Sequence, residues 1–386
     1  MIRAHRVIAL VMTTLSILPT ASAGQESLAD RVHRILSETP LIDGHNDLPG
    51  RIAEFRTSEG DVGTYDLRVR ASGDTDIPRL RQGMVGGQFW SVHVDVAHPQ
   101  PVMKQLEQLD IARRMIDAYP DVLEFASGAS DVERIFGAGK IASLFGIEGG
   151  HVIENSLGAL RAFYSAGVRY MTLTHFSNTD WADSGTDEPV AHGLTAFGEE
   201  VVREMNRMGM IVDLAHTSPE TMMDALRVSD APVIFSHAAA RAIADHPRNV
   251  PDDVLRLLSE NGGVLMQLFY PPYLNEGADT TASIADVADH IEHIRAVAGI
   301  DHVGIGSDFD GIPTYVEGME DVSTYPALFI ELASRGWSDR DLRKLAGDNI
   351  LRVMRDVQAA SRQISRQRPP STKTIEELDG RGGQRP

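Results

Sequence analysis

The feature that most constrains the fold is a regular alternation of short apolar segments with segments of helical periodicity. Eight of the apolar segments have the length and composition of buried strands: residues 41–45, 87–94, 141–147, 168–174, 210–215, 232–236, 263–270 and 302–307. Apolar strands separated by helices are typical of parallel sheets covered on both faces. Eight such units predict an α/β protein with a (β/α)8 TIM barrel, and an open doubly wound sheet is the alternative.

Two further parts of the chain complete this prediction. Helical patterns near residues 323–335 and 338–356 follow the last strand, so we expect extra C-terminal helices. Residues 50–80, with Gly60, Gly63 and Gly73, predict a long insertion, a candidate wall or lid for a site. The sequence has neither GxGxxG after a strand nor GxxxxGK[ST], so nucleotide binding has no support.

The N-terminal segment has the pattern of a secretory signal peptide. Arg3 and Arg6 precede an apolar run that is too short to span a bilayer permanently, and Ala21-Ser22-Ala23 supplies a small-residue cleavage site. We therefore expect residues 1–23 to be removed and the chain to be exported, to the periplasm or the medium of a bacterium. We therefore leave residues 1–23 out of the predicted fold.

The remaining chain divides into a catalytic domain and a polar tail. Residues 24–357 are predicted to form the barrel domain. Residues 358–386 are rich in Gln, Arg, Pro and Gly, and we expect them to be disordered. The C-terminus lacks the apolar end of a glycolipid-anchor signal, so no membrane anchor is predicted.

Charge and cysteine content narrow the possible partners and ligands. The chain has 36 Lys+Arg against 55 Asp+Glu, a formal charge of −19, which argues against nucleic acid or an anionic membrane as the main partner. It has no cysteine, which excludes disulfides, thiolate ligands and a cysteine nucleophile. Any metal ion must therefore be held by His, Asp and Glu.

Residues that can bind a metal or carry a charge follow most of the predicted strands. They are His45, Asp47, Glu148, His175, His216, His237 and Asp308. In a (β/α)8 barrel the C-terminal ends of the strands surround one active-site mouth. The position of these residues therefore predicts a single polar site.

The candidate ligands separate into two sets. His45 and Asp47 are two residues apart at the end of a strand, so both side chains point to the same side. A lone His-x-Asp more often caps a strand, but His216 and His237 end successive strands elsewhere in the predicted barrel. Glu148 follows an apolar run and is placed to bridge the two sets. This arrangement describes a two-metal hydrolase in which the ions share a hydroxide nucleophile.

Eight motifs in this order resemble those of the membrane (renal) dipeptidase family, within the amidohydrolase-like superfamily of metal-dependent hydrolases. The resemblance covers roughly residues 28–356, and its motifs are DGHNDLP at 43–49, GGQFWS at 86–91, GIEG at 146–149, TLTH at 172–175, DLAH at 213–216, FSH at 235–237, RNVPD at 248–252 and GIGSDFDG at 304–311. It implies a zinc-dependent dipeptidase with two Zn2+ per chain and a free dipeptide as its small-molecule substrate. Whether the C-terminal residue of that dipeptide can be a D-residue stays open.

By matching motifs, the resemblance implies a role for each candidate. His45 and Asp47 would hold one zinc ion, His216 and His237 the other, and Glu148 both. The nucleophile would be a hydroxide that bridges the two metals.

Three further residues would act on the substrate. His175 would contact the scissile carbonyl and stabilise the oxyanion. Arg248 would pair with the substrate's C-terminal carboxylate, and Asp308 would carry the proton from water to the leaving amine. Without the resemblance, His175 could be a core histidine, Arg248 could pair with a neighbouring aspartate, and Asp310 would compete with Asp308.

Several alternatives stay open at this stage. The metal site could serve a related dizinc amidohydrolase that acts on another amide, a lactam or an N-acyl amino acid. A catalytically silent exported binding protein is a third reading. A homodimer is expected only from the resemblance, and the covalent dimerisation of mammalian members does not carry over because cysteine is absent. His290 and His293 are interpreted as part of a solvated helix face.

Overall fold

A computed structural model describes residues 26–55, 60–275 and 281–380. The predicted signal peptide, residues 1–23, lies outside the described residues. Within the described ranges, every helix is either too short or too polar to cross a bilayer.

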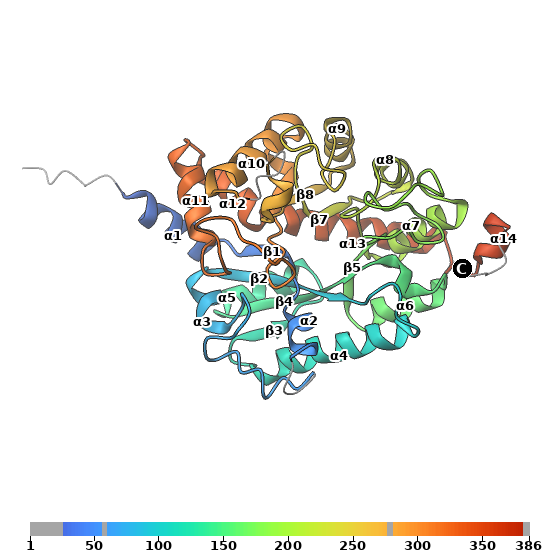
Figure 1. The fold of residues 1–386 in the computed structure, drawn as a ribbon, viewed down its shortest axis with the longest axis horizontal. Coiled ribbons are helices and arrows are strands. Elements are labelled where there is room, and N and C mark those ends of the chain that lie inside the picture. Colours follow the sequence, from blue (N-terminus) through green and yellow to red (C-terminus); the bar gives the residue numbers. More distant parts are fainter. Residues whose placement is uncertain (1–25, 56–59, 276–280, 381–386) are drawn as a thin grey trace, which may run out of the picture.

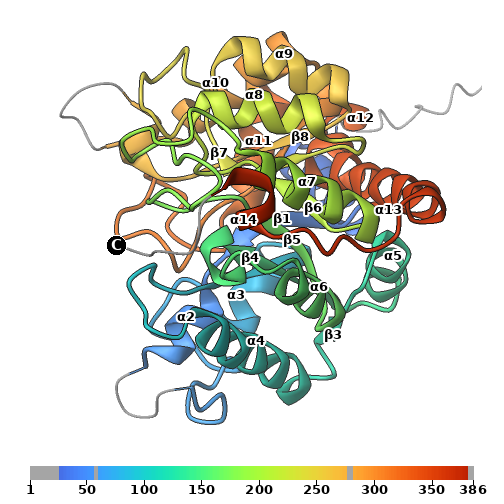
Figure 2. The ribbon, with the colours of Figure 1, turned by 90° about the vertical axis from the view of Figure 1, so that its right-hand side faces the viewer.

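Eight parallel strands close into a barrel, which confirms the predicted fold. Around the ring they are β1 (Leu41–Asn46), β2 (Val85–His93), β4 (Ile141–Glu148), β5 (Val168–Thr172), β6 (Ile211–Asp213), β7 (Ile234–Ala238), β8 (Val264–Gln267) and β9 (Val303–Ile305). Pairing of β2 with β4 and of β9 with β1 completes the ring. Figures 1 and 2 show the strands in the interior with helices around them.

A ninth strand, β3 (Leu123–Phe125), lies outside the ring and was not predicted. It pairs with the first residues of β4, from Ile141 to Ser143, whereas β5 pairs with β4 only from Phe145 onward. The short strand thus covers the part of β4 that its neighbour in the barrel leaves free. Three residues are too few for a periodic pattern to reveal.

The outer layer consists of helices that pack an apolar face on the barrel: α4 (Pro101–Ala118), α5 (Ala129–Gly137), α6 (Leu157–Ser165), α7 (Ala196–Met208), α8 (Pro219–Val228), α9 (Asp252–Asn261) and α10 (Ile284–Ala298). Helix starts are fixed locally by caps. The side chains of Ser156, Thr195 and Ser218 accept N–H groups of the first turns of α6, α7 and α8. α1 (Leu28–Glu38) precedes the barrel and contacts α11.

The predicted insertion between the first two strands contains two short helices, α2 (Leu48–Ala53) and α3 (Ile77–Gln82). Residues 60–76 between them have no regular secondary structure, and residues 56–59 lie outside the described part of the chain. α2 contacts both β2 and α4, so it packs against the barrel beside the end of β1.

The extra C-terminal helices are also confirmed. They are α11 (Tyr325–Ser334), α12 (Asp339–Arg343) and α13 (Asn349–Gln367), with a π-helical turn, η4 (Lys344–Asp348), between the last two. The π turn contacts the start of the barrel, because the carbonyl of Pro40 occupies the place that a side chain at Gly347 would need.

The prediction of a disordered tail is wrong for residues 358–380. α13 continues to Gln367, and a last short helix, α14 (Ile375–Asp379), packs on α7, as Figure 2 shows. Residues 381–386 lie outside the described part of the chain.

Single anchoring residues explain why this polar segment is ordered. Arg368 pairs with Glu200 of α7, and Ile375 is buried. Asp379 accepts the backbone N–H of Phe197 at 3.1 Å, which satisfies a free donor in the first turn of α7. Composition alone does not reveal such isolated contacts.

Candidate metal centre and active site

All the residues expected at the barrel mouth come together at one end of the barrel. They occupy the C-terminal ends of strands or the residues just after them: His45 and Asp47 at β1, Glu148 at β4, His175 after β5, His216 after β6, His237 in β7 and Asp308 after β9. Arg248 lies in the segment between β7 and α9. The site therefore forms where parallel strands of a barrel end, as the fold requires.

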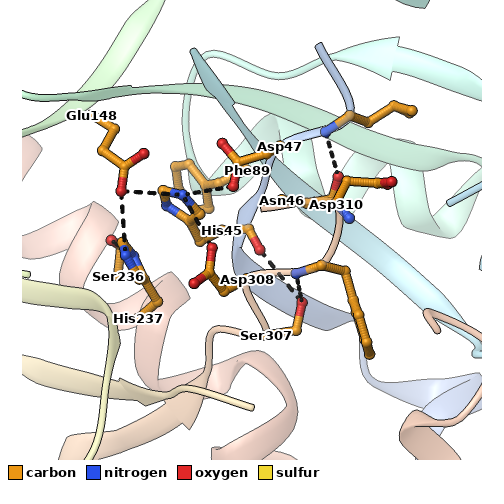
Figure 3. A network of polar contacts seen from close by, with 12 residues as sticks. His45, Asn46, Asp47, Phe89, Glu148, Ser236, His237, Ser307, Asp308 and Asp310 are labelled. Atoms are coloured by element: carbon orange, nitrogen blue, oxygen red, sulfur yellow. Dashed lines mark hydrogen bonds and ion pairs between the residues drawn. The ribbon is translucent and has the colours of Figure 1, made fainter. Parts of the chain in front are cut away.

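One carboxylate oxygen, Oε1 of Glu148, lies at the centre of the site. It is 2.9 Å from Nε2 of His216, 3.4 Å from Nε2 of His237, 3.6 Å from Nε2 of His175 and 3.7 Å from Nε2 of His45. Figure 3 shows Glu148 pointing toward His45 and His237. Four imidazole nitrogens thus converge on one oxygen that comes from a different strand.

A second set of contacts surrounds His45. Its Nε2 lies 3.3 Å from Oδ2 of Asp47 and 3.9 Å from Oδ1 of Asp308. The ring centroids of His45 and His237 are 3.9 Å apart, so the two ligand sets adjoin each other. Glu148 lies between them, in the bridging position expected from the sequence.

These residues fit divalent cations. Within each of the groups His45/Asp47/Glu148, Glu148/His216/His237 and His45/His237/Asp308, one ligand atom per residue lies within 4.8 Å of the others. The first two groups are the predicted ligand sets. The buried Nε2 of His45 makes no hydrogen bond within the described chain, and Nε2 atoms of His216 and His237 face each other at 2.9 Å. Imidazole and carboxylate donors of this kind suit zinc.

Contacts behind two of the imidazoles fix their orientation. Tyr170 donates its hydroxyl to the Gly44 carbonyl at 3.0 Å, so its oxygen accepts from Nδ1–H of His45, also at 3.0 Å. Nε2 of His45 is then the ring nitrogen that faces Glu148. On the other side, Nδ1 of His237 lies 2.9 Å from the hydroxyl of Ser236. Such outer contacts usually set the tautomer of a metal-binding histidine.

The loop between β5 and α7 holds two of the histidines by their backbones. Ser184 donates its hydroxyl to the His175 carbonyl at 2.6 Å, and the N–H of Gly185 donates to the His216 carbonyl at 2.7 Å. One loop thereby fixes His175 relative to His216.

Arg248 is buried at the edge of the site with unused donors. Its relative exposure is 1%, and one guanidinium nitrogen donates to the His237 carbonyl at 3.0 Å. Its Nε and its other terminal nitrogen have no hydrogen-bond partner in the described chain. The aspartates considered as partners are engaged elsewhere, Asp245 with Arg241 and Asp252 with His293.

Burial and neighbouring charges set the protonation of the site. Burial lowers the pKa of His216 and His237 well below the usual range, so both are neutral, and it raises the pKa of Glu148 and of Asp308. Burial opposes a charge on His45, yet nearby carboxylates, Asp47 foremost, raise its pKa to about 10. A cation bound there would displace that proton.

His175 has the opposite behaviour. Burial, with smaller contributions from His93 and Arg248, lowers the pKa of His175 to about 2. It is therefore a neutral imidazole at the mouth of the site, able to donate one hydrogen bond.

A cavity of about 350 Å³ opens over these residues. Its lining includes Asp47, Glu148, His175, His216 and Asp308, together with Asp310, which the sequence offered as a competitor of Asp308, and residues that sequence reasoning missed: Arg51, Glu54, His93, Gln108 and Phe176. His93 had a recognisable signal, since it lies at the end of a strand like the ligands. The others come from α2, α4 and loops, whose approach to the mouth the sequence does not reveal.

The interpretation of α10 as a solvated histidine face is wrong for His290. This side chain is fully buried, its Nδ1 accepts the N–H of Ala240 at 3.1 Å, and its Nε2 lies 2.9 Å from the Leu274 carbonyl. His290 joins α10 to two loops. Its role is structural.

Comparison with known proteins agrees with this geometry. A metallopeptidase from Rhodobacter sphaeroides, whose structure contains a phosphinate mimic of the dipeptide L-Ala-D-Ala, is 26% identical, with a TM-score of 0.75 over 83% of this chain and 99% of that chain. Dipeptidase AC, a metallopeptidase of family M19, is 28% identical, with a TM-score of 0.75 over 83% and 98% of the two chains. The probable dipeptidase PvdM from Pseudomonas aeruginosa, 24% identical, has the same fold, with a TM-score of 0.77 over 86% and 99%.

The family profile covers nearly the whole barrel. The profile of the membrane dipeptidases, peptidase family M19, matches residues 29–368. Family membership implies metal dependence, and the clustered ligand groups at the barrel mouth agree with it. The chain therefore belongs to the membrane dipeptidase family, in the amidohydrolase-like superfamily, and is a metallo-dipeptidase.

Proposed function

We propose that this protein is a dizinc dipeptidase that hydrolyses free dipeptides, including those with a D-residue at the C-terminal position. The observation that carries the proposal is the convergence of four Nε2 atoms on Oε1 of Glu148, beside a buried Arg248 with unused donors. The first feature suits two cations that share one carboxylate. The second suits a substrate with a free carboxylate.

His45 and Asp47 would hold one zinc ion, His216 and His237 the other, and Glu148 both. When bound, two such ions polarise the substrate carbonyl and lower the pKa of a shared water from about 15.7 toward 7. The neutral state of His216 and His237 favours binding, because only an unprotonated nitrogen is a ligand.

The remaining residues would bind and orient the dipeptide. Two donors of Arg248 would clamp its C-terminal carboxylate, which brings the scissile bond over Glu148. His175, a neutral donor at the mouth, would hydrogen-bond the carbonyl oxygen as negative charge develops there. Asp308, whose pKa is raised by burial, would accept the proton of the attacking water and deliver it to the leaving amine.

Support for a D-residue comes from the Rhodobacter sphaeroides metallopeptidase, which holds a mimic of L-Ala-D-Ala. We propose that this chain accepts the same configuration.

The test is release of free amino acids from L,L- and L,D-dipeptides by the zinc-loaded protein, beside His216→Ala. Matched N-acetylated and C-terminally amidated dipeptides show which end is recognised. We expect cleavage of dipeptides, loss of cleavage in His216→Ala and poor cleavage of the amides. A protein that binds two zinc ions but cleaves no dipeptide would overturn the proposal and favour another amide, a lactam or an N-acyl amino acid as substrate.

Export and dimerisation are separate proposals. Export rests on the pattern of residues 1–23, and a homodimer rests on the family resemblance. Sequencing the N-terminus of the protein recovered from a bacterial host tests the first, with residue 24 expected as the new start. Sedimentation equilibrium tests the second.

A further inference from the structure

We propose that two buried aspartates, Asp43 and Asp213, act as matching clamps that set the spacing of the metal ligands. Neither is a ligand, and both would be positioning residues. The inference rests on the proposed two-metal centre and extends it to the strands behind the ligands.

The first clamp joins β1 to the end of β9. Oδ1 of Asp43 accepts the N–H of Ser307 at 2.8 Å and of His45 at 3.3 Å. Its Oδ2 accepts the hydroxyls of Ser307 at 2.6 Å and of Tyr325 at 2.7 Å. Ser307 immediately precedes Asp308. One side chain thus fixes the backbones that carry His45 and Asp308.

The second clamp, between β6 and β7, repeats the Oδ1 contacts of the first. Oδ1 of Asp213 accepts the N–H of Ala215 at 3.0 Å and of Ser236 at 2.8 Å. Ala215 precedes His216, and Ser236 precedes His237. In each clamp, therefore, one aspartate oxygen accepts two backbone N–H groups. One belongs to the residue two positions after the aspartate, and the other belongs to a serine that immediately precedes a functional residue at the end of the neighbouring strand.

The clamps lie where the barrel has least backbone pairing. β1 and β9 share one register pair, Asp43 with Ile305, and β6 and β7 share one, Asp213 with Ile234. By contrast, β2 and β4 are paired from Gly87 to His93. Where the ladder is this short, the aspartate side chain adds to the few backbone bonds, such as that from the Leu214 N–H to the Ile234 carbonyl at 2.8 Å, in holding neighbouring strands at a fixed offset.

The two clamps also touch each other through the barrel interior. A side chain at Gly44 or at Gly306 would overlap the carbonyl oxygen of Ser236. The backbones around Asp43 therefore pack directly on the backbone held by Asp213. This contact fixes the first ligand set relative to the second, which sets the distance between two ions.

The test uses zinc titration of metal-free protein by calorimetry, with thermal melting of the same samples. In Asp213→Ala we expect one of the two ions to bind about 10–100-fold more weakly, the range typical of contacts behind metal ligands. Asp43→Ala should weaken the other ion. Asp213→Asn and Asp43→Asn keep an acceptor oxygen and should restore most of the affinity. Asp76→Ala is the matched control, because Asp76 is also fully buried and accepts backbone N–H groups, but those of Ala71 and Arg79 in its own segment and not of residues beside a candidate ligand.

A combination with His237→Ala assigns the sites. If Asp213 acts through His216 and His237, adding Asp213→Ala to His237→Ala should weaken binding little further, whereas adding Asp43→Ala should weaken the ion that is left. The clamp proposal is overturned if both alanine variants melt lower, as Asp76→Ala does, yet bind two ions with unchanged affinity. A wild-type protein that binds no second ion would instead overturn the proposed dizinc function.

Discussion

His216 and Asp308 share a left-handed backbone conformation, with φ of 69° and 70°, although their strands are not neighbours in the barrel. For residues other than glycine this conformation is uncommon and costs on the order of 1–3 kcal/mol. Backbone bonds to other segments hold it: the N–H of Gly185 donates to the His216 carbonyl at 2.7 Å, and the N–H of Asp308 donates to the His45 carbonyl at 3.2 Å. The strain is thus located at two of the residues expected to work directly on the reaction.

This conformation makes Asp308→Asn an informative variant. Asparagine tolerates left-handed backbone, so we expect the fold to be kept. It cannot carry the proton, so kcat for a dipeptide should fall by about 10²–10⁴-fold. Asp245→Asn, at an exposed aspartate, is the control. A kcat within tenfold of the wild type would contradict the role given to Asp308.

Arg248→Lys tests the carboxylate clamp. A lysine keeps the charge but cannot offer two parallel donors, so we expect kcat/KM for dipeptides to fall by about 10–100-fold, mainly through KM. Arg241→Lys is the control, because Arg241 pairs with Asp245 in the same segment. For a C-terminally amidated dipeptide the variant and the wild type should differ little. Equal losses on both substrates would argue against the clamp.

The low pKa of His175 predicts how stability depends on pH. The unfolded chain takes up a proton on this residue below about pH 6.5, whereas the folded protein, with a pKa of about 2, does not. Stability is therefore complete above pH 6.5 and falls as the pH is lowered. Between pH 7.5 and 5.5 this single group contributes a loss of about 1.4 kcal/mol.

Urea unfolding of metal-free wild type and His175→Asn at pH 7.5 and 5.5 measures this contribution. The variant should lose about 1.4 kcal/mol less than the wild type over this interval. His175→Gln serves as a second replacement. Identical losses in all three proteins would mean that His175 is protonated in the folded state.

The ordered C-terminal segment predicts a stability effect far from the site. Asp379→Ala removes the acceptor for the N–H of Phe197 and should cost about 1 kcal/mol of unfolding free energy, as the loss of a helix cap does. Asp379→Asn keeps an acceptor oxygen and should cost much less. Urea unfolding compares the two, and kcat should be unchanged in both. Equal stability of both variants would show that the contact contributes nothing.

The barrel and the positions of the candidate ligands could be predicted because their signals are local. A parallel strand covered on both faces is a continuous apolar run, as in residues 141–147, and the ligand follows where the run ends. The order of the strands around the barrel then brings candidate ligands that are far apart in the sequence close together in space. Seven residues placed at the mouth from sequence were found there.

The features that were missed depend on contacts between segments. β3 is three residues long, and the sequence of Leu123–Phe125 does not indicate that it pairs with the first residues of β4. His290 and His293 differ in burial although both lie on α10, because loops cover only one of them. The tail is polar in composition, yet a few residues attach it to α7. Such pairings are set by tertiary structure, which periodicity does not encode.

The hydrogen bond between Ser307 and Asp43 joins positions 264 residues apart, one on the first strand of the barrel and one just after the last. A chain emerging from the ribosome cannot close its ring until residue 307 has been made. Until then β1 presents one unpaired edge, and the group that includes Asp308 is incomplete. Translation products that stop before this point would hold an open sheet prone to aggregation and proteolysis.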